Sequence, residues 1–245
     1  MPVERFYIDT SLEDKQVITF EGEEFHHLAH VLRIRPKETI EVINGRGYLA
    51  FIYIESVEKN KATGKVTSVS YTPAPPYSLI LAQAIPRQPR LEYIIEKAVE
   101  LGITELWLFP GRYSEKTTFS SSGKDRVFHI ISSAMKQCGR LHIPKVVFLP
   151  NIEKWSTPLP KSSFFGDTRK EAPPFILSLT RQNPSSILLT IGPEKGFHAE
   201  ETLYMQEKLL MQGIHLHSNI LRTDTAAICG LSLASYYLEN QPNFC

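Results

Sequence analysis

The fold of this chain is decided by two segments, Ile191-Gly192-Pro193-Glu194-Lys195-Gly196-Phe197 and Leu221-Arg222-Thr223-Asp224-Thr225-Ala226-Ala227. The first lies between an apolar run and a segment with helical periodicity, so we expect it in a strand-to-helix turn. The second opens a further helix. Exposed backbone N–H groups in such turns favour a ligand, and open α/β folds bind ligands where their parallel strands end. Both segments are therefore candidates for one functional site.

Strands alternate with helices along the chain from residue 77 onwards. Short apolar runs bounded by Gly, Pro or Asn predict strands at 79–84, 103–109, 146–149, 163–165, 186–191 and 214–216. Apolar residues at helical spacing predict helices at 90–101, 124–138, 199–211 and 225–238. Ser121 or Ser122 is available as the N-cap of the second helix. The pattern predicts an α/β domain with a mostly parallel sheet.

The first 72 residues have a different pattern. Asn44-Gly45-Arg46-Gly47 is a strong hairpin-turn sequence between two runs rich in β-branched and aromatic residues, 38–43 and 48–56. Further strands are predicted at 3–8, 17–20 and 65–71, with one helix from 23 to about 32. These elements indicate a small β-barrel or sandwich.

A boundary between the two regions is expected at Thr72-Pro73-Ala74-Pro75-Pro76, because prolines remove backbone donors and hold the chain extended. We therefore predict one domain over 1–72, a linker over 73–76 and a second domain over 77–245.

Composition excludes several classes of protein. The 245 residues are 42% hydrophobic and 22% charged, which is unlike disordered or fibrous chains. Lys and Arg number 27 against 26 acidic residues, so any basic surface for nucleic acid must be local. Three cysteines without C-x-x-C spacing suggest neither a disulfide framework nor a zinc site. Without a signal peptide or an apolar run of about 18 residues, a soluble cytoplasmic protein is expected.

The two deciding segments differ in the chemistry that they suggest. Gly192 to Phe197 is neither a dinucleotide-binding fingerprint nor a phosphate-binding P-loop, and a plain strand-to-helix turn remains an alternative. In the second segment, Thr223 or Asp224 is expected to cap the helix. Arg222 places a cation near a helix N-terminus, where it opposes the macrodipole. An anionic partner or substrate for Arg222 is a reasonable inference.

Basic and histidine residues offer candidate RNA contacts. Four arginines lie near the ends of predicted elements, at Arg87, Arg90, Arg112 and Arg140. They would form a positive surface if their loops share one edge of the sheet. Solvated loop ends explain these arginines equally well. In the first domain His26, His27 and His30 precede Arg33 and Arg35. No H-E-x-x-H motif or third ligand supports a metal there, so no metal is expected. A structural helix or an RNA-facing surface containing His27 and Arg33 is more plausible.

Five motifs in order make the chain similar to a known family, the SPOUT-class methyltransferases that methylate N3 of a uridine in 16S ribosomal RNA. They are His26-His27-Leu28 with Val31-Leu32-Arg33, Glu96-Lys97-Ala98-Val99-Glu100-Leu101-Gly102-Ile103, Gln137-Cys138-Gly139-Arg140, Gly192-Pro193-Glu194-x-Gly196-Phe197, and Ile220-Leu221-Arg222-Thr223-Asp224-Thr225-Ala226. The resemblance covers nearly the whole length. It implies an N-terminal PUA-like barrel, a C-terminal α/β domain with a trefoil knot, a homodimer, and S-adenosylmethionine held by the knot loops.

Site residues follow from the resemblance by position. The expected cofactor contacts are Gly166, Asp167, Ile191, Gly192, Pro193, Glu194, Lys195, Gly196, Leu216, Ser218, Asn219, Ile220, Leu221 and Thr225. Arg222 is the candidate for stabilising negative uracil oxygens during methyl transfer. Glu194 is expected to orient the base, act on a proton or hold the loop.

The sequence departs from the family pattern at four places. Lys195 stands where Gly is usual, and a left-handed backbone there would cost about 1–2 kcal/mol. Leu216-His217-Ser218-Asn219 replaces Leu-Gly-x-Arg, so Asn219 stands where a guanidinium is usual. Lys136 replaces a Glu, and Asp224 replaces a Glu.

The resemblance therefore predicts S-adenosylmethionine-dependent methylation of a uridine N3, with 16S ribosomal RNA or the small ribosomal subunit as partner. N3 lies on the Watson–Crick edge, so the target base must be unpaired or flipped out. Two alternatives stay open. One is a non-catalytic RNA-binding assembly factor that lost the cofactor site, and the other is a methyltransferase with a different RNA target.

Overall fold

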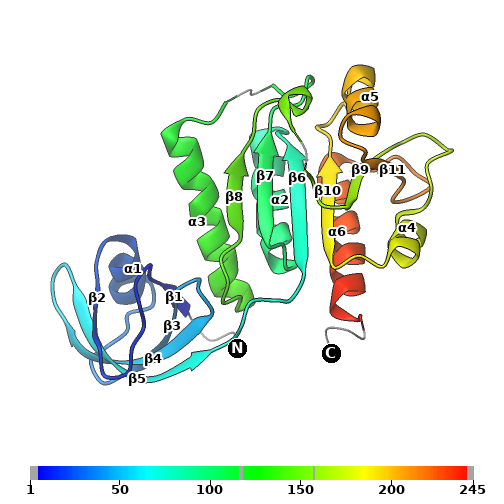
Figure 1. Cartoon of the computed structure of the whole chain (residues 1–245). Coiled ribbons are helices and arrows are strands. Elements are labelled where there is room, and N and C mark those ends of the chain that lie inside the picture. Colours follow the sequence, from blue (N-terminus) through cyan, green and yellow to red (C-terminus); the bar gives the residue numbers. More distant parts are fainter. Residues whose placement is uncertain (1–4, 116–117, 157, 242–245) are drawn as a thin grey trace. The chain divides into compact units, whose positions relative to one another are not determined.

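A computed structural model describes residues 5–115, 118–156 and 158–241 (Figure 1). The chain divides into two compact units, Met1–Ala74 with Ser132–Ile143, and Pro75–Ile131 with Pro144–Cys245. The grouping of 132–143 with the N-terminal unit has no signal in the sequence. The domain limits 1–72 and 77–245, with their linker, stay a prediction.

The N-terminal unit is built on a five-stranded sheet in the order β1-β3-β4-β5-β2. Its strands are β1 Arg5–Tyr7, β2 Val17–Phe20, β3 Thr39–Ile43, β4 Tyr48–Val57 and β5 Ala62–Tyr71. The predicted hairpin joins β3 to β4, and its turn contains Gly45 at φ 72° and Gly47 at φ 91°. The side chain of Asn44 closes the turn by accepting a hydrogen bond from the Arg46 backbone at 2.9 Å. The turn sequence thus predicted the hairpin correctly.

The predicted helix over 23–32 is two short elements, α1 Gly22–His26 and the π-helical turn η1 His27–Val31. The Leu32 amide donates to the His27 carbonyl, five residues earlier, at 2.9 Å. Arg33 then takes a left-handed conformation at φ 55°, which ends the helix. Apolar spacing cannot reveal such a one-residue shift in hydrogen bonding.

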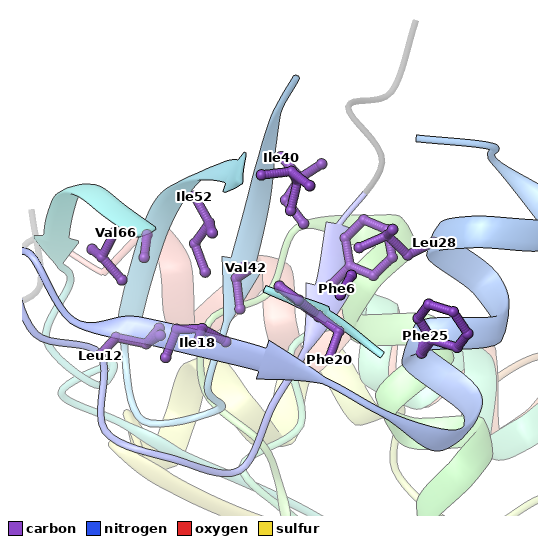
Figure 2. Close-up of a cluster of buried hydrophobic side chains, with 13 residues drawn as sticks. Phe6, Leu12, Ile18, Phe20, Phe25, Leu28, Ile40, Val42, Ile52 and Val66 are labelled. Carbon is purple, nitrogen blue, oxygen red and sulfur yellow. The ribbon is translucent and has the colours of Figure 1, made fainter. Parts of the chain in front are cut away.

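Alternating residues form the core of this unit. Along β4, Ala50, Ile52 and Ile54 are fully buried while Phe51 and Tyr53 are exposed, the period of two expected for a strand with one solvent face. Figure 2 shows the buried side chains gathered between the strands and α1. Hydrophobic burial therefore sets the register of the sheet.

Lys136, the departure in the segment 132–143, has a local partner. Its ammonium lies 2.6 Å from Glu24, and both side chains are about four-fifths buried. A glutamate at this position would place two carboxylates together, so the lysine fits this chain's own α1.

The C-terminal unit is built on a six-stranded sheet in the order β11-β9-β10-β6-β7-β8. The strands are β6 Ser78–Ala84, β7 Glu105–Phe109, β8 Lys145–Phe148, β9 Ser162–Gly166, β10 Ser186–Ile191 and β11 Gln212–Ile214. Every neighbouring pair is parallel. The carboxyl ends of all six strands therefore lie at one edge.

Helices cover both faces of this sheet. They are α2 Gln88–Glu100, α4 Phe175–Gln182, α5 Ala199–Glu207, α6 Thr223–Glu239 and the short 3-10 turn η2 Ile152–Lys154. Helix α3 Ser121–Cys138 belongs to this unit as far as Ile131. Helices α2 and α6 pack together behind the sheet in Figure 1, and α6 contacts β10 and β6. On the other face, Met205 of α5 and Ile152 of η2 pack against apolar residues of β6 and β10. None of the helices within the described residues is long and apolar enough to cross a membrane.

Three local predictions need correction. Helix α4 was not predicted, because its eight residues lie in a segment where the apolar pattern is short. Helix α5 ends at Glu207 rather than 211, since Leu210 takes a left-handed conformation at φ 54°. The cap of α3 is Ser120, whose hydroxyl accepts from the Gly123 amide at 3.1 Å, rather than Ser121 or Ser122.

Gly47→Ala should destabilise the protein more than Gly22→Ala. Both glycines have positive φ, which costs alanine about 1 kcal/mol. A Cβ at Gly47 would also lie 2.4 Å from the Thr72 carbonyl oxygen, whereas a Cβ at Gly22 meets nothing within 4 Å. Urea unfolding should give a loss of about 1 kcal/mol for Gly22→Ala and at least about 2 for Gly47→Ala. Equal losses would contradict the contact with Thr72.

Candidate functional site

The parallel sheet brings the expected cofactor segments to one edge. Gly166, at the end of β9, pairs with Ile214, at the end of β11, and Ile191 of β10 pairs with Gln83 of β6. The segments that follow these strand ends are 167–169, 192–197 and 215–222. They therefore leave the sheet side by side, as ligand loops of doubly wound folds do.

The loop after β10 is built around two glycines. A Cβ at Gly192 would lie 3.2 Å from the Gly196 backbone, a tight contact, so glycine favours the close fold of this loop on itself. Gly196 has φ 73°, its amide donates to the Pro193 carbonyl at 2.9 Å, and a Cβ there would meet nothing within 4 Å. The loop thus presents backbone beside open space, which suits a small ligand.

Lys195 does not strain this loop. It is exposed and is not among the residues with positive φ in the described chain. The left-handed residue of the turn is Gly196 instead. The conformational cost expected for a left-handed lysine at position 195 therefore does not arise.

Gln83 is a central residue of the edge that the sequence reading missed. It is fully buried, and its Nε2 lies 2.8 Å from the Ala84 carbonyl, 3.1 Å from Thr223 Oγ1, 3.3 Å from the Gly192 carbonyl and 3.4 Å from the Ile191 carbonyl. Its Oε1 is buried without a hydrogen-bond partner in the described chain. The sequence does contain a signal for this role, because Gln83 is the one polar side chain in the apolar strand predicted at 79–84.

The start of α6 differs from the expected cap. Arg222 takes the N-cap position, and no side chain caps the helix. Thr223 Oγ1 instead donates to the Gly192 carbonyl at 2.6 Å. The capping prediction for Thr223 and Asp224 is therefore wrong, because both side chains bond to other elements.

Asp224 belongs to an ionic group that joins three elements. Arg90 Nη1 of α2 lies 2.9 Å from each carboxylate oxygen of Asp224, and Arg90 Nε lies 3.6 Å from Glu194 Oε1. The same Glu194 oxygen accepts from the Arg87 backbone amide at 3.0 Å. The group is partly solvated, so we attach no large energy to it. Its geometry fixes the loop 192–197 against the starts of α2 and α6.

Arg222 is exposed at the N-terminus of α6. Among the described residues no carboxylate lies within ion-pair distance of its guanidinium. Neighbouring Ile220 is 82% exposed. Arg222 is thus a cation available to an anion from outside the chain, in contrast to Arg90.

The other two segments also carry defined polar contacts. The Asp167 amide donates to the Ile214 carbonyl at 2.8 Å, and its carboxylate accepts from Arg169 Nε at 2.9 Å. Burial raises the pKa of Asp167, but hydrogen bonds from the Arg169 side chain and backbone outweigh burial and hold that pKa below its usual 3.8. After β11, the Asn219 amide donates to His217 Nδ1 at 3.0 Å. Asn219 is not among the residues with positive φ in the described chain.

The remaining expected cofactor contacts differ in exposure. Leu216 and Leu221 are half-buried, whereas Ser218, Asn219 and Thr225 are exposed. Pro193, within the loop 192–197, is buried. The segment 216–222 is therefore a mostly exposed strip that ends at Arg222.

The expected RNA contacts are scattered and often paired with acids. In the C-terminal unit, Arg112 contacts Glu153 at 2.7 Å and Glu200 at 2.5 Å, and Arg87 contacts Glu115 at 2.9 Å. Hydrogen bonds to Glu153 and Glu200 raise the pKa of Arg112. In the N-terminal unit, Arg140 donates to the His142 carbonyl at 2.7 Å, half-buried His27 packs on Phe6, and Arg33 is exposed. The structure thus leaves Arg33 as an accessible cation and engages Arg87, Arg90 and Arg112 internally.

Within the ranges that the structure describes, no three His, Cys, Asp or Glu side chains form a group able to hold a metal. His26 and His30 lie near each other, with ring centroids 5.2 Å apart.

Asp167→Asn should remove a pH-dependent part of the stability. A carboxyl whose folded pKa is lowered stabilises the protein above its unfolded pKa and loses this effect as pH falls through the folded value. In urea unfolding, the difference between wild type and Asp167→Asn should be full near about pH 6 and shrink below about pH 4. Arg169→Met should show the same trend. A difference that stays constant down to about pH 2.5 would contradict the Asp167–Arg169 assignment.

Comparison with known proteins agrees with this architecture. A family model described as RNA methyltransferase domain matches residues 73–235, and one described as RNA methyltransferase PUA domain matches residues 20–67. The chain is 28% identical over 242 residues to "Ribosomal RNA small subunit methyltransferase E" of Buchnera aphidicola, covering 94% of each protein. It is 26% identical to the protein of that name from Bacillus subtilis, covering 97% of this chain and 98% of the other.

Solved structures show the same fold. One is a ribosomal RNA small subunit methyltransferase E from Neisseria gonorrhoeae bound to S-adenosyl methionine, with TM-score 0.83, 25% identity and coverage of 96% and 97%. A putative methyltransferase from Legionella pneumophila in complex with its cofactor has TM-score 0.88, 24% identity and coverage of 96% and 98%. The expected α/β methyltransferase domain with a mostly parallel sheet, preceded by a PUA-like domain, is confirmed. The chain therefore belongs to the RNA methyltransferase family, in which a PUA domain precedes the methyltransferase domain.

Proposed function

We propose that this protein is an S-adenosylmethionine-dependent methyltransferase that methylates N3 of a uridine in 16S ribosomal RNA. The family and the names of its relatives support this activity. The observation that carries it in the structure is the loop 192–197, whose two glycines present close-packed backbone beside open space at the carboxyl edge of the sheet.

The residues at this edge fit the cofactor. We assign its binding to the backbone of Gly166 and Asp167, of the loop Ile191 to Gly196, and of the strip Leu216 to Leu221 with Thr225. The polar side chains of these segments are exposed or, like Asp167, already engaged, so recognition falls mainly to N–H and C=O groups. Bound S-adenosylmethionine supplies the methyl group from its sulfonium.

Arg222 is the candidate catalytic cation. Removal of the weakly acidic N3 proton places negative charge on the uracil oxygens, and a preorganised cation next to them lowers the barrier. Arg222 suits this role because it is exposed, borders the strip 216–221 and lacks a carboxylate partner among the described residues.

Glu194 is assigned to holding the loop. One of its oxygens already accepts from the Arg87 amide and faces Arg90. Because these contacts tie Glu194 to the start of α2, we favour a role in holding the loop over proton transfer.

RNA contacts are proposed within each unit separately. Arg33 with His27 in the PUA-like domain, and Arg140 in the same unit, would meet phosphates and fix the RNA without reading its sequence. Arg87, Arg90 and Arg112 would contact RNA only by exchanging carboxylate partners for phosphates.

Further features rest on the same resemblance. The chain passes from β11 at one edge of the sheet to α6, which packs on β10 and β6, so the segment 215–222 crosses the ends of β9 and β10. We propose that this crossing is the trefoil knot. A homodimer, a small-subunit substrate and a cytoplasmic location complete the proposal.

The alternative of a non-catalytic assembly factor has lost part of its support. Lys195 causes no backbone strain, and the glycine frame of the loop is intact. Lys195 and Ser218-Asn219 still depart from the family pattern within the cofactor segments, but Lys195 does so without a positive φ.

Purified protein incubated with unmodified 16S ribosomal RNA or small subunits should form 3-methyluridine only when S-adenosylmethionine is present. Nucleoside mass spectrometry after complete digestion measures this product. Methyl transfer to another position would support a different RNA target. Failure to bind S-adenosylhomocysteine in calorimetry, together with RNA binding, would support the assembly factor.

Arg222→Ala should lower kcat by about 10²- to 10³-fold while the Kd for S-adenosylhomocysteine changes little, because its charge acts on the uracil in the transition state. Single-turnover methylation and calorimetry measure the two quantities. Lys208→Ala removes an exposed cation outside the proposed site and serves as the control, with near wild-type values for both. Equal losses of kcat and affinity in Arg222→Ala would overturn the assignment.

A further inference from the structure

The Gln83 side chain joins three segments that are distant in sequence. It comes from β6, and its Nε2 reaches the end of β10 at Ile191 and Gly192 and the start of α6 at Thr223. The shortest of its contacts are 2.8 Å to the Ala84 carbonyl and 3.1 Å to Thr223 Oγ1. These elements frame the proposed cofactor loop.

The chemistry of the acceptors fixes the orientation of this amide. Ala84, Ile191 and Gly192 each present a carbonyl oxygen, and Thr223 spends its only hydroxyl hydrogen on the Gly192 carbonyl at 2.6 Å. A rotated amide would place Oε1 against four acceptors and leave the NH₂ group unpaired. The NH₂ group therefore faces this cluster, and Thr223 receives a hydrogen bond from Gln83 while donating one to Gly192.

The unpaired Oε1 shows that Gln83 is not an ordinary core residue. A buried carbonyl oxygen without a partner is unfavourable, and an apolar side chain would avoid it. Thr190, fully buried on the neighbouring strand, likewise carries an unpartnered hydroxyl, but nothing in the described chain bonds to it. Among the described residues, Gln83 alone combines an unpaired buried atom with a cluster of short contacts at the loop.

We propose that Gln83 is a positioning residue of the cofactor site. Its amide and the Thr223 hydroxyl hold the Gly192 carbonyl in a fixed place, so that the loop 192–197 and the start of α6 are arranged before the cofactor arrives. Such preorganisation raises affinity, because the ordering cost is met during folding rather than during binding. This inference rests on the proposed function and assigns to it a residue outside the three cofactor segments.

Gln83→Leu tests the proposal, with Thr190→Val as the matched control for altering a buried polar residue in the same sheet. Gln83→Leu should weaken S-adenosylhomocysteine binding by about tenfold or more in calorimetry. It should raise KM for S-adenosylmethionine by a similar factor and leave kcat at saturation within about threefold. Hydrogen exchange of the loop amides in the cofactor-free protein should become faster. Thr190→Val should change none of these values.

A second pair of variants keeps the test valid if Gln83→Leu does not fold. Thr223→Val removes the bridging hydroxyl at nearly constant shape, and Thr223→Ser retains it, so weakened binding in the first and recovery in the second is expected. The positioning role would be overturned if Gln83→Leu or Thr223→Val bound S-adenosylhomocysteine as tightly as Thr190→Val does. Absence of binding in the wild type would instead overturn the proposed function itself.

Discussion

The bond from the Thr223 hydroxyl to the Gly192 carbonyl, 2.6 Å long, is the interaction on which the site depends. It joins the residue after β10 to the start of α6, which are 31 residues apart in the sequence. Gln83 supports the bond from a third element, and Arg90 adds an ionic connection through Asp224 and Glu194. Together these contacts tie the loop 192–197 to β6, α2 and α6.

The same contacts divide the cations at this edge into two kinds. Arg90 is held between two carboxylates and serves the architecture. Arg222, at the adjacent N-cap, lacks such a partner in the described part of the chain, and the positive end of α6 adds to its field. A site arranged in this way stabilises negative charge that arrives with a ligand or develops during reaction. The structural acids thus keep Arg90 from competing with Arg222 for that charge.

Local sequence signals predicted much of the fold and less of the site. The strand 186–191 and the hairpin turn at 44–47 follow from β-branched runs and turn chemistry, which act over a few residues. The π-helical turn at His27–Val31 differs from a helix by one hydrogen-bond shift and leaves no periodicity to read. Thr223 and Asp224 were expected to cap α6 because Thr and Asp are favoured at helix N-termini, a preference that can be read from the local sequence. Their actual partners, Gly192 and Arg90, lie 31 and 134 residues away.

A crystal structure of the protein with S-adenosylhomocysteine tests the central claim most directly, since the claim concerns where the cofactor binds. The account predicts the ligand at the carboxyl edge of the sheet, bonded to backbone of the loop 192–196 and the strip 216–221. Arg222 should face the open side of the pocket, with the Gly192–Thr223 bond unchanged. A ligand bound elsewhere on the chain, or a loop that breaks this bond to admit it, would contradict the account.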